Sequence, residues 1–344
     1  MATRQSNRRG SAGRRSTIGD VARHAGVSAA TVSRVVNGVF DKASPETIAR
    51  VQDSIRELNY RPGSIGRALR KQESRLVPFL VPDVGNAYYA AIAVAIEAAL
   101  HERDYAMILC NTGEMPDIQD AYLAEMQSHL VPGFVMMGAV ESAGLARMVE
   151  AGDNLIFVNR RNPYEGDQPF VGIDNAGAGR DIADYLARTA RLDCAMIHGP
   201  LSSSASRDRM EGFQAGLAAH GVELPKSRIA EGGLTPAGGY EAASRLFDGG
   251  SPPKAIFCVN DLTAYGAYRR CTELGFGVPD DIQLFGIDDN PMNEWVAPWL
   301  STVHIPTDAM GQAVGTMIMR FLDGMRVGDI ADVLLPYSIV VHDQ

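Results

Sequence analysis

The sequence contains few cysteines, and no two of them have the spacing of metal ligands. Cys110, Cys194, Cys258 and Cys271 are scattered along 344 residues in apolar contexts, which predicts buried free thiols rather than disulfides or a metal site. No apolar run reaches membrane-spanning length. The first sixteen residues have no hydrophobic core and do not resemble a secretory signal, so we expect a cytoplasmic protein that does not contact membranes.

The sequence also lacks the local motifs of common catalytic and nucleotide-binding sites. No P-loop, G-x-S-x-G elbow or H-E-x-x-H helix occurs, and Gly177-Ala178-Gly179 lacks the third glycine of a dinucleotide-binding turn. The seven histidines are dispersed, and His198 and His304, near expected strand ends, favour structural roles. We therefore expect no enzyme activity, no catalytic residue, no cofactor and no metal.

What the sequence does contain is a strong charge asymmetry. Residues 1–75 carry 15 Lys and Arg against 6 Asp and Glu, a net charge of +9, whereas the remainder carries 17 against 35, a net charge of −18. A basic head on an acidic body is typical of a protein that touches DNA with one end. Residues 1–16 are expected to form a disordered basic arm, which either adds nonspecific phosphate contacts or has no role.

Residues 17–37, TIGDVARHAGVSAATVSRVVN, predict two short helices joined by a tight turn. Thr17 and Asp20 have the spacing of a capping box, Gly26 suits a turn that needs positive φ, and Ser28 suits the cap of the second helix. The residues expected to face outward from the second helix are Ala29, Ala30, Ser33 and Arg34. This is the layout of a helix-turn-helix that reads bases in the major groove, and the alternative is a helical hairpin in an ordinary core.

Residues 44–70 predict a third helix followed by a short helix of marginal stability. Ser44-Pro45 has the pattern of a cap followed by the first helical position, and Arg61-Pro62-Gly63 ends the helix. Residues 64–70 could form one further short helix, which would be too short to be stable alone. We therefore expect a three-helix DNA-binding domain over residues 17–62, followed by a hinge over residues 63–75 that folds on contact with DNA.

From residue 76 to residue 344, short apolar runs alternate with helical segments. LVPFLVPD, YAMILC, GFVMMG, NLIFVN, FVGID, CAMIHG, AIFCVN and IQLFGID are continuous apolar runs, as expected for strands buried on both faces of parallel sheets. The pattern predicts an α/β body with doubly wound parallel sheets.

These features together resemble the lactose-repressor/galactose-repressor (LacI/GalR) family of bacterial transcription regulators. The resemblance is carried by TIGDVARHAGVSAATVSRVVNG followed by LNYRPGSIGRALR, and it continues in order to the C-terminus. It implies that Ala29, Ala30 and Arg34 face bases in the major groove, where Arg34 could grip guanine through two hydrogen bonds. The residues that it implies hold phosphates or the helix geometry are Thr17, Ser28, Thr31, Ser33 and Asn37.

The resemblance also gives the hinge a role. It implies that the hinge helices of two subunits pair in the minor groove and that Leu69 wedges between base pairs there; packing of Leu69 against the body is the alternative. Gly66, on the same DNA-binding helix, stands where the family usually has alanine, and Gly63 where it usually has asparagine. Because glycine weakens a helix by roughly 1 kcal/mol, we expect a hinge that orders less readily.

For the body, the resemblance implies two subdomains like those of periplasmic sugar-binding proteins, with an effector cleft between them. We place one subdomain at residues 76–174 with 304–334, and the other at 175–303 with the C-terminal end. The effector contacts expected at the strand ends facing this cleft are Asn86, Tyr88, Tyr89, Asn159, Arg160, Asp174, Arg209, Asn260, Asp261 and Asp288. Such side chains can hold neighbouring hydroxyls, and tyrosine can cover an apolar sugar face.

Individual assignments in the cleft leave alternatives open. Asn260-Asp261 could be an ordinary helix cap, and Asp288 could belong to an ordinary turn. Arg160-Arg161 and Arg209 favour a sugar acid or sugar phosphate, although Arg160 could instead pair with Asp174. Leu234 stands where the family often has an aromatic or polar residue, and residues 131–133, VPG, where Asp-Gly is usual; both weaken any inference about which sugar is bound.

The resemblance therefore predicts a repressor whose affinity for DNA is set by a sugar or sugar derivative. A homodimer would bind a pseudo-palindromic operator, and the C-terminus shows no heptad extension of the tetramer-forming kind. Whether the effector releases or promotes DNA binding stays open. The alternative is a sugar-binding or sugar-modifying protein whose main activity lies in the body.

Overall fold

The computed structural model describes residues 16–40, 42–60, 74–248 and 251–342. The chain divides into two compact units, Met1–Ser74 and Arg75–Gln344, and each unit is described by itself. The predictions for the N-terminal arm and for Gly63, Gly66 and Leu69 of the hinge lie outside the described residues. No helix in the described part of the chain is long and apolar enough to cross a membrane.

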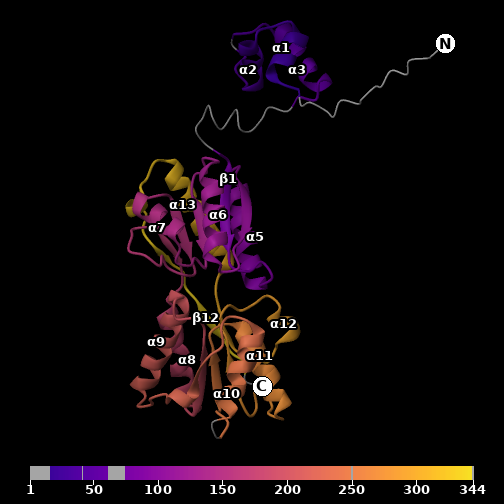
Figure 1. Ribbon diagram of the computed structural model, residues 1–344. Coiled ribbons are helices and arrows are strands. Elements are labelled where there is room, and N and C mark those ends of the chain that lie inside the picture. Colours follow the sequence, from indigo (N-terminus) through magenta and orange to yellow (C-terminus); the bar gives the residue numbers. More distant parts are fainter. Residues whose placement is uncertain (1–15, 41, 61–73, 249–250, 343–344) are drawn as a thin grey trace, which may run out of the picture. The chain divides into compact units, whose positions relative to one another are not determined.

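The first unit contains three capped helices, α1 (Ile18–Ala25), α2 (Ala29–Val36) and α3 (Pro45–Glu57) (Figure 1). Thr17 and Asp20 form the predicted capping box at the start of α1, and Gly26 ends that helix with φ of 63°. Ser28 and Ser44 cap α2 and α3 by accepting hydrogen bonds from backbone N–H groups three residues on. The local signals in the sequence therefore fix where each helix begins.

A small apolar core holds these three helices together. Its buried members are Val21, Ala22, Ala25, Val32, Val35 and Val51. The opposite face of α2 is exposed, because the valines of this helix that recur at helical spacing pack into the core.

The first subdomain of the second unit is built on a six-stranded sheet with the order β11-β5-β4-β3-β1-β2. All of its pairings are parallel, as the continuous apolar runs predicted. Its strands are β1 (Leu76–Val81), β2 (Ala106–Asn111), β3 (Phe134–Met137), β4 (Leu155–Val158), β5 (Phe170–Gly172) and β11 (Val333–Leu334). Its helices are α5 (Ala87–His101), α6 (Pro116–Gln127), α7 (Ala143–Ala151) and α13 (Thr307–Leu322).

The two faces of this sheet are covered by different helix pairs. Phe79, Val135 and Ile156 pack in the cluster that contains α5 and α13 residues, whereas Leu80 and Phe157 pack with α6 and α7 residues. Alternate residues of one strand thus serve opposite cores, which explains why β1, β3 and β4 are apolar throughout. The edge strand β2 differs from the prediction, because most of its residues are not buried.

The second subdomain has a four-stranded parallel sheet with the order β7-β6-β8-β9. Its strands are β6 (Cys194–His198), β7 (Ile229–Glu231), β8 (Ala255–Cys258) and β9 (Gln283–Phe285). Bridges from Phe285 and Asp288 continue to β10 (Thr302–His304), which pairs antiparallel with β12 (Ser338–Val340). The helices are α8 (Asn175–Arg188), α9 (Ser204–Ala219), α10 (Pro236–Phe247), α11 (Asp261–Glu273) and the short α12 (Asn293–Val296), with a 3₁₀ turn at Lys226–Arg228. A second 3₁₀ turn, Val327–Asp329, lies in the first subdomain between α13 and β11.

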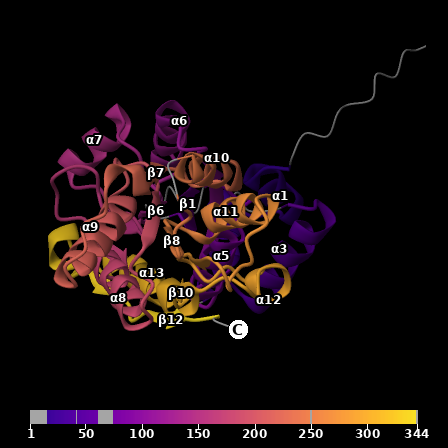
Figure 2. The ribbon, with the colours of Figure 1, turned by 90° about the horizontal axis from the view of Figure 1, so that it is seen from below.

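Figure 2 shows α8 and α9 on one side of β6 and β8, and α10 and α11 on the other. The chain crosses between the two subdomains after β5, after β10 and after β11. The predicted α/β class with parallel, doubly wound sheets is confirmed.

Candidate functional site

The exposed face of α2 carries the candidate DNA contacts. Ala29, Ala30 and Arg34 are all exposed, and Arg34 forms no ion pair within the described residues. A small-residue surface beside an unpaired guanidinium can enter the major groove without a steric barrier and donate to guanine.

The polar residues around α2 fix its ends. The Ser28 hydroxyl accepts from the backbone of Thr31 at 3.1 Å and lies 2.9 Å from the Thr31 hydroxyl. Asn37 donates its side-chain amide to the carbonyl of Ser33 at 2.6 Å. These bonds, with the Thr17 cap on α1, hold the helix that presents Arg34.

In the body, the predicted effector residues follow the carboxyl ends of strands. Asn86 caps α5 after β1, and Asn260 caps α11 after β8. Asn159 follows β4 and Asp288 follows β9; both are buried, with φ of 65° and 131°. Backbone strain of this kind in non-glycine residues is common at ligand sites, where the side chain must point in one direction.

Arg209 on α9 is the most informative of these residues, because only 3% of its surface is exposed. Its Nε donates to Oδ1 of Asn175 at 2.8 Å, and its Nη1 donates to the carbonyl of Val259 at 2.7 Å. Its Nη2 is buried with no hydrogen-bond partner among the described residues, and the same holds for the hydroxyl of Tyr88 on α5. An unpaired buried donor costs about 1–3 kcal/mol, so two of them facing the same region indicate a ligand site.

Asp288 lies with these two donors, because its charge and that of Arg209 both act on Tyr88. Burial raises the pKa of Asp288 well above its usual value, while Arg209 acts to lower it. Burial also raises the pKa of Tyr88, and that of Tyr89 to about 12, so both hydroxyls stay protonated at neutral pH. The cluster can donate to a ligand from Arg209 and Tyr88 and can accept from it at Asp288.

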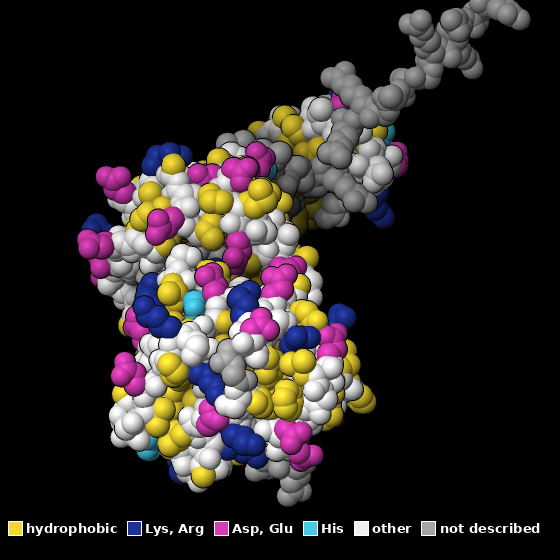
Figure 3. All heavy atoms as spheres, turned by 60° about the horizontal axis from the view of Figure 1, so that its bottom comes forward, with side chains coloured by type: hydrophobic (Ala, Val, Ile, Leu, Met, Phe, Trp, Pro, Cys, Tyr) yellow, Lys and Arg dark blue, Asp and Glu magenta, His cyan; other side chains and the backbone are white. Residues whose placement is uncertain are grey.

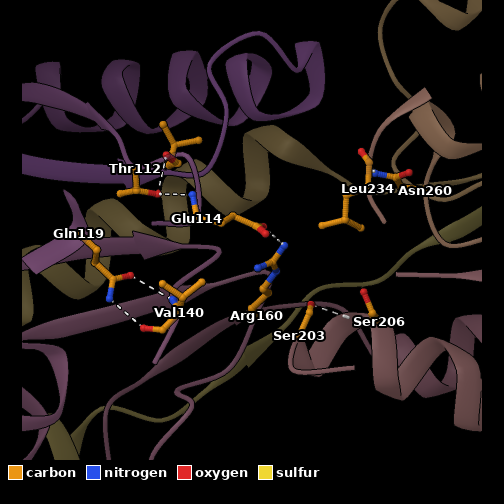
Figure 4. A network of polar contacts seen from close by, with 10 residues as sticks. Thr112, Glu114, Gln119, Val140, Arg160, Ser203, Ser206, Leu234 and Asn260 are labelled. Atoms are coloured by element: carbon orange, nitrogen blue, oxygen red, sulfur yellow. Dashed lines mark hydrogen bonds and ion pairs between the residues drawn. The ribbon is translucent and has the colours of Figure 1, made fainter. Parts of the chain in front are cut away.

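Arg160 is paired within its own subdomain. Its Nη2 lies 2.5 Å from a carboxylate oxygen of Glu114, a residue that the sequence analysis missed. The alternative partner, Asp174, caps α8 and pairs with Arg180 at 3.3 Å instead. Figure 4 shows the Glu114–Arg160 pair, with Leu234 and Asn260 of the second subdomain approaching from the other side.

Arg161 lines a small cavity between the subdomains, but its guanidinium is already paired. Its guanidinium pairs with Asp332 at 2.7 Å and lies 4.3 Å from the centre of the Phe170 ring. Its backbone N–H donates to the Ser204 hydroxyl across the two subdomains at 2.8 Å. Residues of both subdomains, including Asn159, Asp174 and Ser204, enclose a small polar cavity of about 70 Å³ here. Of the three arginines on which the predicted preference for a sugar acid or phosphate rests, Arg160 and Arg161 are paired, and Arg209 keeps an unpaired donor.

Asp261 supports the site rather than lining it. The residue is fully buried, and one carboxylate oxygen accepts from the backbone of Asn290 and the side chain of Asn293, both at 2.7 Å. The other oxygen accepts from the Thr302 hydroxyl at 2.6 Å. Because both oxygens are occupied by protein donors, the structure favours a role for Asp261 in holding the loop after Asp288 over direct effector contact.

The surface of the body differs from that of α2. Figure 3 shows acidic and basic side chains interspersed on the face of the body turned toward the viewer. Such a mixture does not attract a polyanion in the way that a single-signed basic surface does.

Comparison with known proteins matches both parts of the chain. Residues 17–63 match the family described as bacterial regulatory proteins, lacI family, and residues 183–343 match the periplasmic binding protein-like domain. The HTH-type transcriptional repressor PurR of Proteus mirabilis is 33% identical over 305 residues, which cover 88% of this chain and 89% of that protein. The PurR of Yersinia enterocolitica is 32% identical over 328 residues, covering 95% and 94%.

Solved structures share the same architecture. A complex of the transcriptional regulator CelR with cellobiose is 27% identical with a TM-score of 0.71, covering 95% of this chain and 99% of that one. A lac repressor dimer bound to operator and the anti-inducer ONPF is 24% identical with a TM-score of 0.82, covering 95% and 98%, and this likeness concerns the fold.

The curated relatives are repressors rather than enzymes. Their identity over nearly the whole chain, together with the capped reading helix and the buried ligand cluster, leads to one assignment. The chain belongs to the lacI family of bacterial regulatory proteins and is a DNA-binding transcriptional repressor controlled by a small-molecule effector that binds in its body.

Proposed function

We propose that this repressor binds a pseudo-palindromic operator as a homodimer and that a hydroxylated, sugar-like effector in the cleft sets its affinity for DNA. The exposed face of α2 is the observation that carries the DNA-reading half of the proposal. Arg34 would contact a guanine in each half-site, and Ala29 and Ala30 would contact thymine methyl groups. Ser28, Thr31, Ser33 and Asn37 would fix the helix and contact phosphates. The target is chromosomal DNA, so we place the protein in the cytoplasm.

The unpaired donors of Arg209 and Tyr88 are the observation that carries the effector half. Together with the Asp288 carboxylate, they form two donors and one acceptor from different subdomains. Adjacent hydroxyls of a sugar can satisfy all three, because each hydroxyl both donates and accepts. The CelR structure holds cellobiose, which supports the same class of ligand here.

The apolar surface along α5 and β2 supports the homodimer. A groove of about 340 Å³ is lined mostly by apolar side chains from these elements. Val94 on α5 is 69% exposed, and Val84 in the loop after β1 is more than two-fifths exposed. Leu109 is also more than two-fifths exposed and lies on β2, an edge strand with a free side. Exposed apolar patches of this kind mark interfaces. Figure 1 shows α12, which carries the exposed Trp295, on the same side of the body as α5.

Effector binding would change the angle between the two subdomains. Through the dimer, this movement would change the affinity for the operator. Tyr88 and Arg209 belong to different subdomains, so a ligand that bonds to both favours one relative arrangement of them. A coupling of this kind is typically worth about 1–3 kcal/mol.

In vitro selection from a random DNA library would test the DNA-reading assignment. We expect a two-fold symmetric site, and we expect Arg34→Ala to lose about 1–3 kcal/mol of preference for one base pair in each half-site. Arg23→Ala is the matched control, because Arg23 lies on α1 with its side chain 82% exposed and pairs with Asp20. Equal preferences in the two variants would refute the role of Arg34.

Sedimentation of the purified chain would test the dimer. A charge at the centre of the apolar groove, Val94→Lys, should give monomers. Leu130→Lys places the same charge at an exposed leucine that follows α6 and should leave the dimer intact. Monomers in the unchanged chain, or dimers in Val94→Lys, would contradict the proposed interface.

A further inference from the structure

Charged side chains of both signs surround the two cleft tyrosines, Tyr88 and Tyr89. Four charged side chains act on the buried hydroxyl of Tyr89: Arg160, Asp288, Glu114 and Arg209. Two of them are guanidiniums and two are carboxylates. Arg161, the other arginine expected here, is held by Asp332.

Glu114 supplies the carboxylate that pairs with Arg160. It lies in the loop between β2 and α6, where Gly113 and Glu114 both have positive φ, 61° and 57°. A glutamate in that conformation is unfavourable, and the loop is held there by Thr112, whose hydroxyl donates to the Val81 carbonyl and accepts from the backbone of Glu114. The strained backbone directs the Glu114 carboxylate onto Arg160 (Figure 4).

Arg160 has no other neutralising partner among the described residues, and its side chain is only 6% exposed. Without Glu114, a buried guanidinium would add to Arg209 and would favour an anionic ligand. With Glu114 in place, a carboxylate or phosphate on the ligand would meet an Arg160 guanidinium that is already paired and the Asp288 carboxyl near Arg209, and it would lose its hydration as well.

We propose that Glu114 acts as a charge filter, so that the effector of this repressor is an uncharged hydroxylated molecule and sugar acids and sugar phosphates are rejected. The inference rests on the effector site proposed above and adds the charge of its ligand. Leu234, where the family pattern often has an aromatic or polar residue, adds an uncharged wall on the opposite side of the cleft (Figure 4).

The test uses matched sets of ligands with the full-length protein. Each set contains a neutral hexose or disaccharide, the corresponding sugar acid and the corresponding sugar phosphate, and the melting temperature is measured with each. We expect the best ligand of the unchanged protein to be a neutral member, with a rise of about 5 °C when it is in hundredfold excess over its Kd. The acid and phosphate of the same sugar should bind at least about tenfold more weakly.

Glu114→Gln should move this preference toward the acid by about tenfold or more, because it exposes the charge of Arg160 without changing the side-chain shape. Glu125→Gln, near the end of α6 with a 68% exposed side chain, is the control and should keep the original preference. A best ligand that is an acid or phosphate would overturn the charge filter and leave the repressor assignment intact. Identical preferences in the two variants would overturn the role of Glu114.

The comparison in the unchanged protein needs no variant, so it decides the ligand charge even if Glu114→Gln does not fold. If no member of any set changes the melting temperature, the hydroxylated ligand class itself is wrong. Selection of a symmetric DNA site by the same preparation would then show that the repressor function stands without it.

Discussion

Replacing Asp261 with alanine should loosen the loop that follows Asp288, one of the proposed effector-binding residues. The substitution removes the acceptor of three hydrogen bonds, from the Asn290 backbone, the Asn293 side chain and the Thr302 hydroxyl. All three donor residues are buried. Each donor left without a partner costs about 1–3 kcal/mol, and removal of a buried carboxylate returns part of that cost. We expect a net loss of about 3–5 kcal/mol in the free energy of unfolding.

The assay is thermal unfolding of the full-length variant beside Asp289→Ala. Asp289 is the neighbour of Asp288, and its one ion pair among the described residues is with His304, whose side chain is 48% exposed. An exposed pair of this kind contributes about 0–1 kcal/mol, so the control should unfold close to the unchanged protein. At about 2–4 °C per kcal/mol, a loss of about 3–5 kcal/mol means that Asp261→Ala should unfold roughly 6–20 °C lower.

Hydrogen exchange gives a second readout of the same prediction. The backbone amide of Asn290 should exchange faster in Asp261→Ala, because its acceptor is gone. A variant within about 1 kcal/mol of Asp289→Ala, with unchanged exchange at Asn290, would show that Asp261 does not hold this loop, and the reasoning would fail.

Two further variants probe the cleft and the packing of the second subdomain. Asp288→Asn should raise the melting temperature without ligand and abolish the ligand response, because it removes a buried charge that the ligand needs. The pKa of Asp288 in the folded protein lies above its value in the unfolded chain, so ionisation of this carboxyl lowers stability as pH rises from about 4 through the raised pKa. The extra stability of Asp288→Asn over the unchanged protein should therefore be larger at pH 7 than at pH 4. An equal difference at the two pH values would refute this reasoning. Gly212→Ala should destabilise by about 1–3 kcal/mol, because its Cβ would lie 2.0 Å from the carbonyl oxygen of Ala176. Gly19→Ala, whose Cβ meets only a hydroxyl at 3.6 Å, should be tolerated in the same denaturation assay.

The three-helix DNA-binding domain could be predicted from the sequence because the signals that fix its helices are local. The caps at Thr17, Ser28 and Ser44 each act on a backbone group three residues away. The strands of the body could be predicted for a similar reason, since burial on both faces requires continuous apolar runs.

The functions of individual cleft residues were less predictable, because they depend on contacts between distant segments. Arg160 meets Glu114 across 46 positions, and Asp261 meets donors 29 to 41 positions away. An Asn-Asp pair at a strand end does not indicate which of its side chains will face a ligand. Glu114 gave a weak signal, since Gly-Glu before Met-Pro suggests only a turn ahead of a helix. The predictions for Gly66 and Leu69 stay predictions.

The crossings of the chain between subdomains have a consequence for synthesis. The first sheet lacks its edge strand β11 and its covering helix α13 until the chain has been made beyond β10. About 135 residues separate the end of β5 from the start of α13, so at about 5–20 residues per second the ribosome needs roughly 7–27 s to supply them. During that interval the β5 edge and the sheet face that α13 later covers are open to other nascent chains. This protein should therefore depend on chaperones most strongly while its second subdomain is being translated.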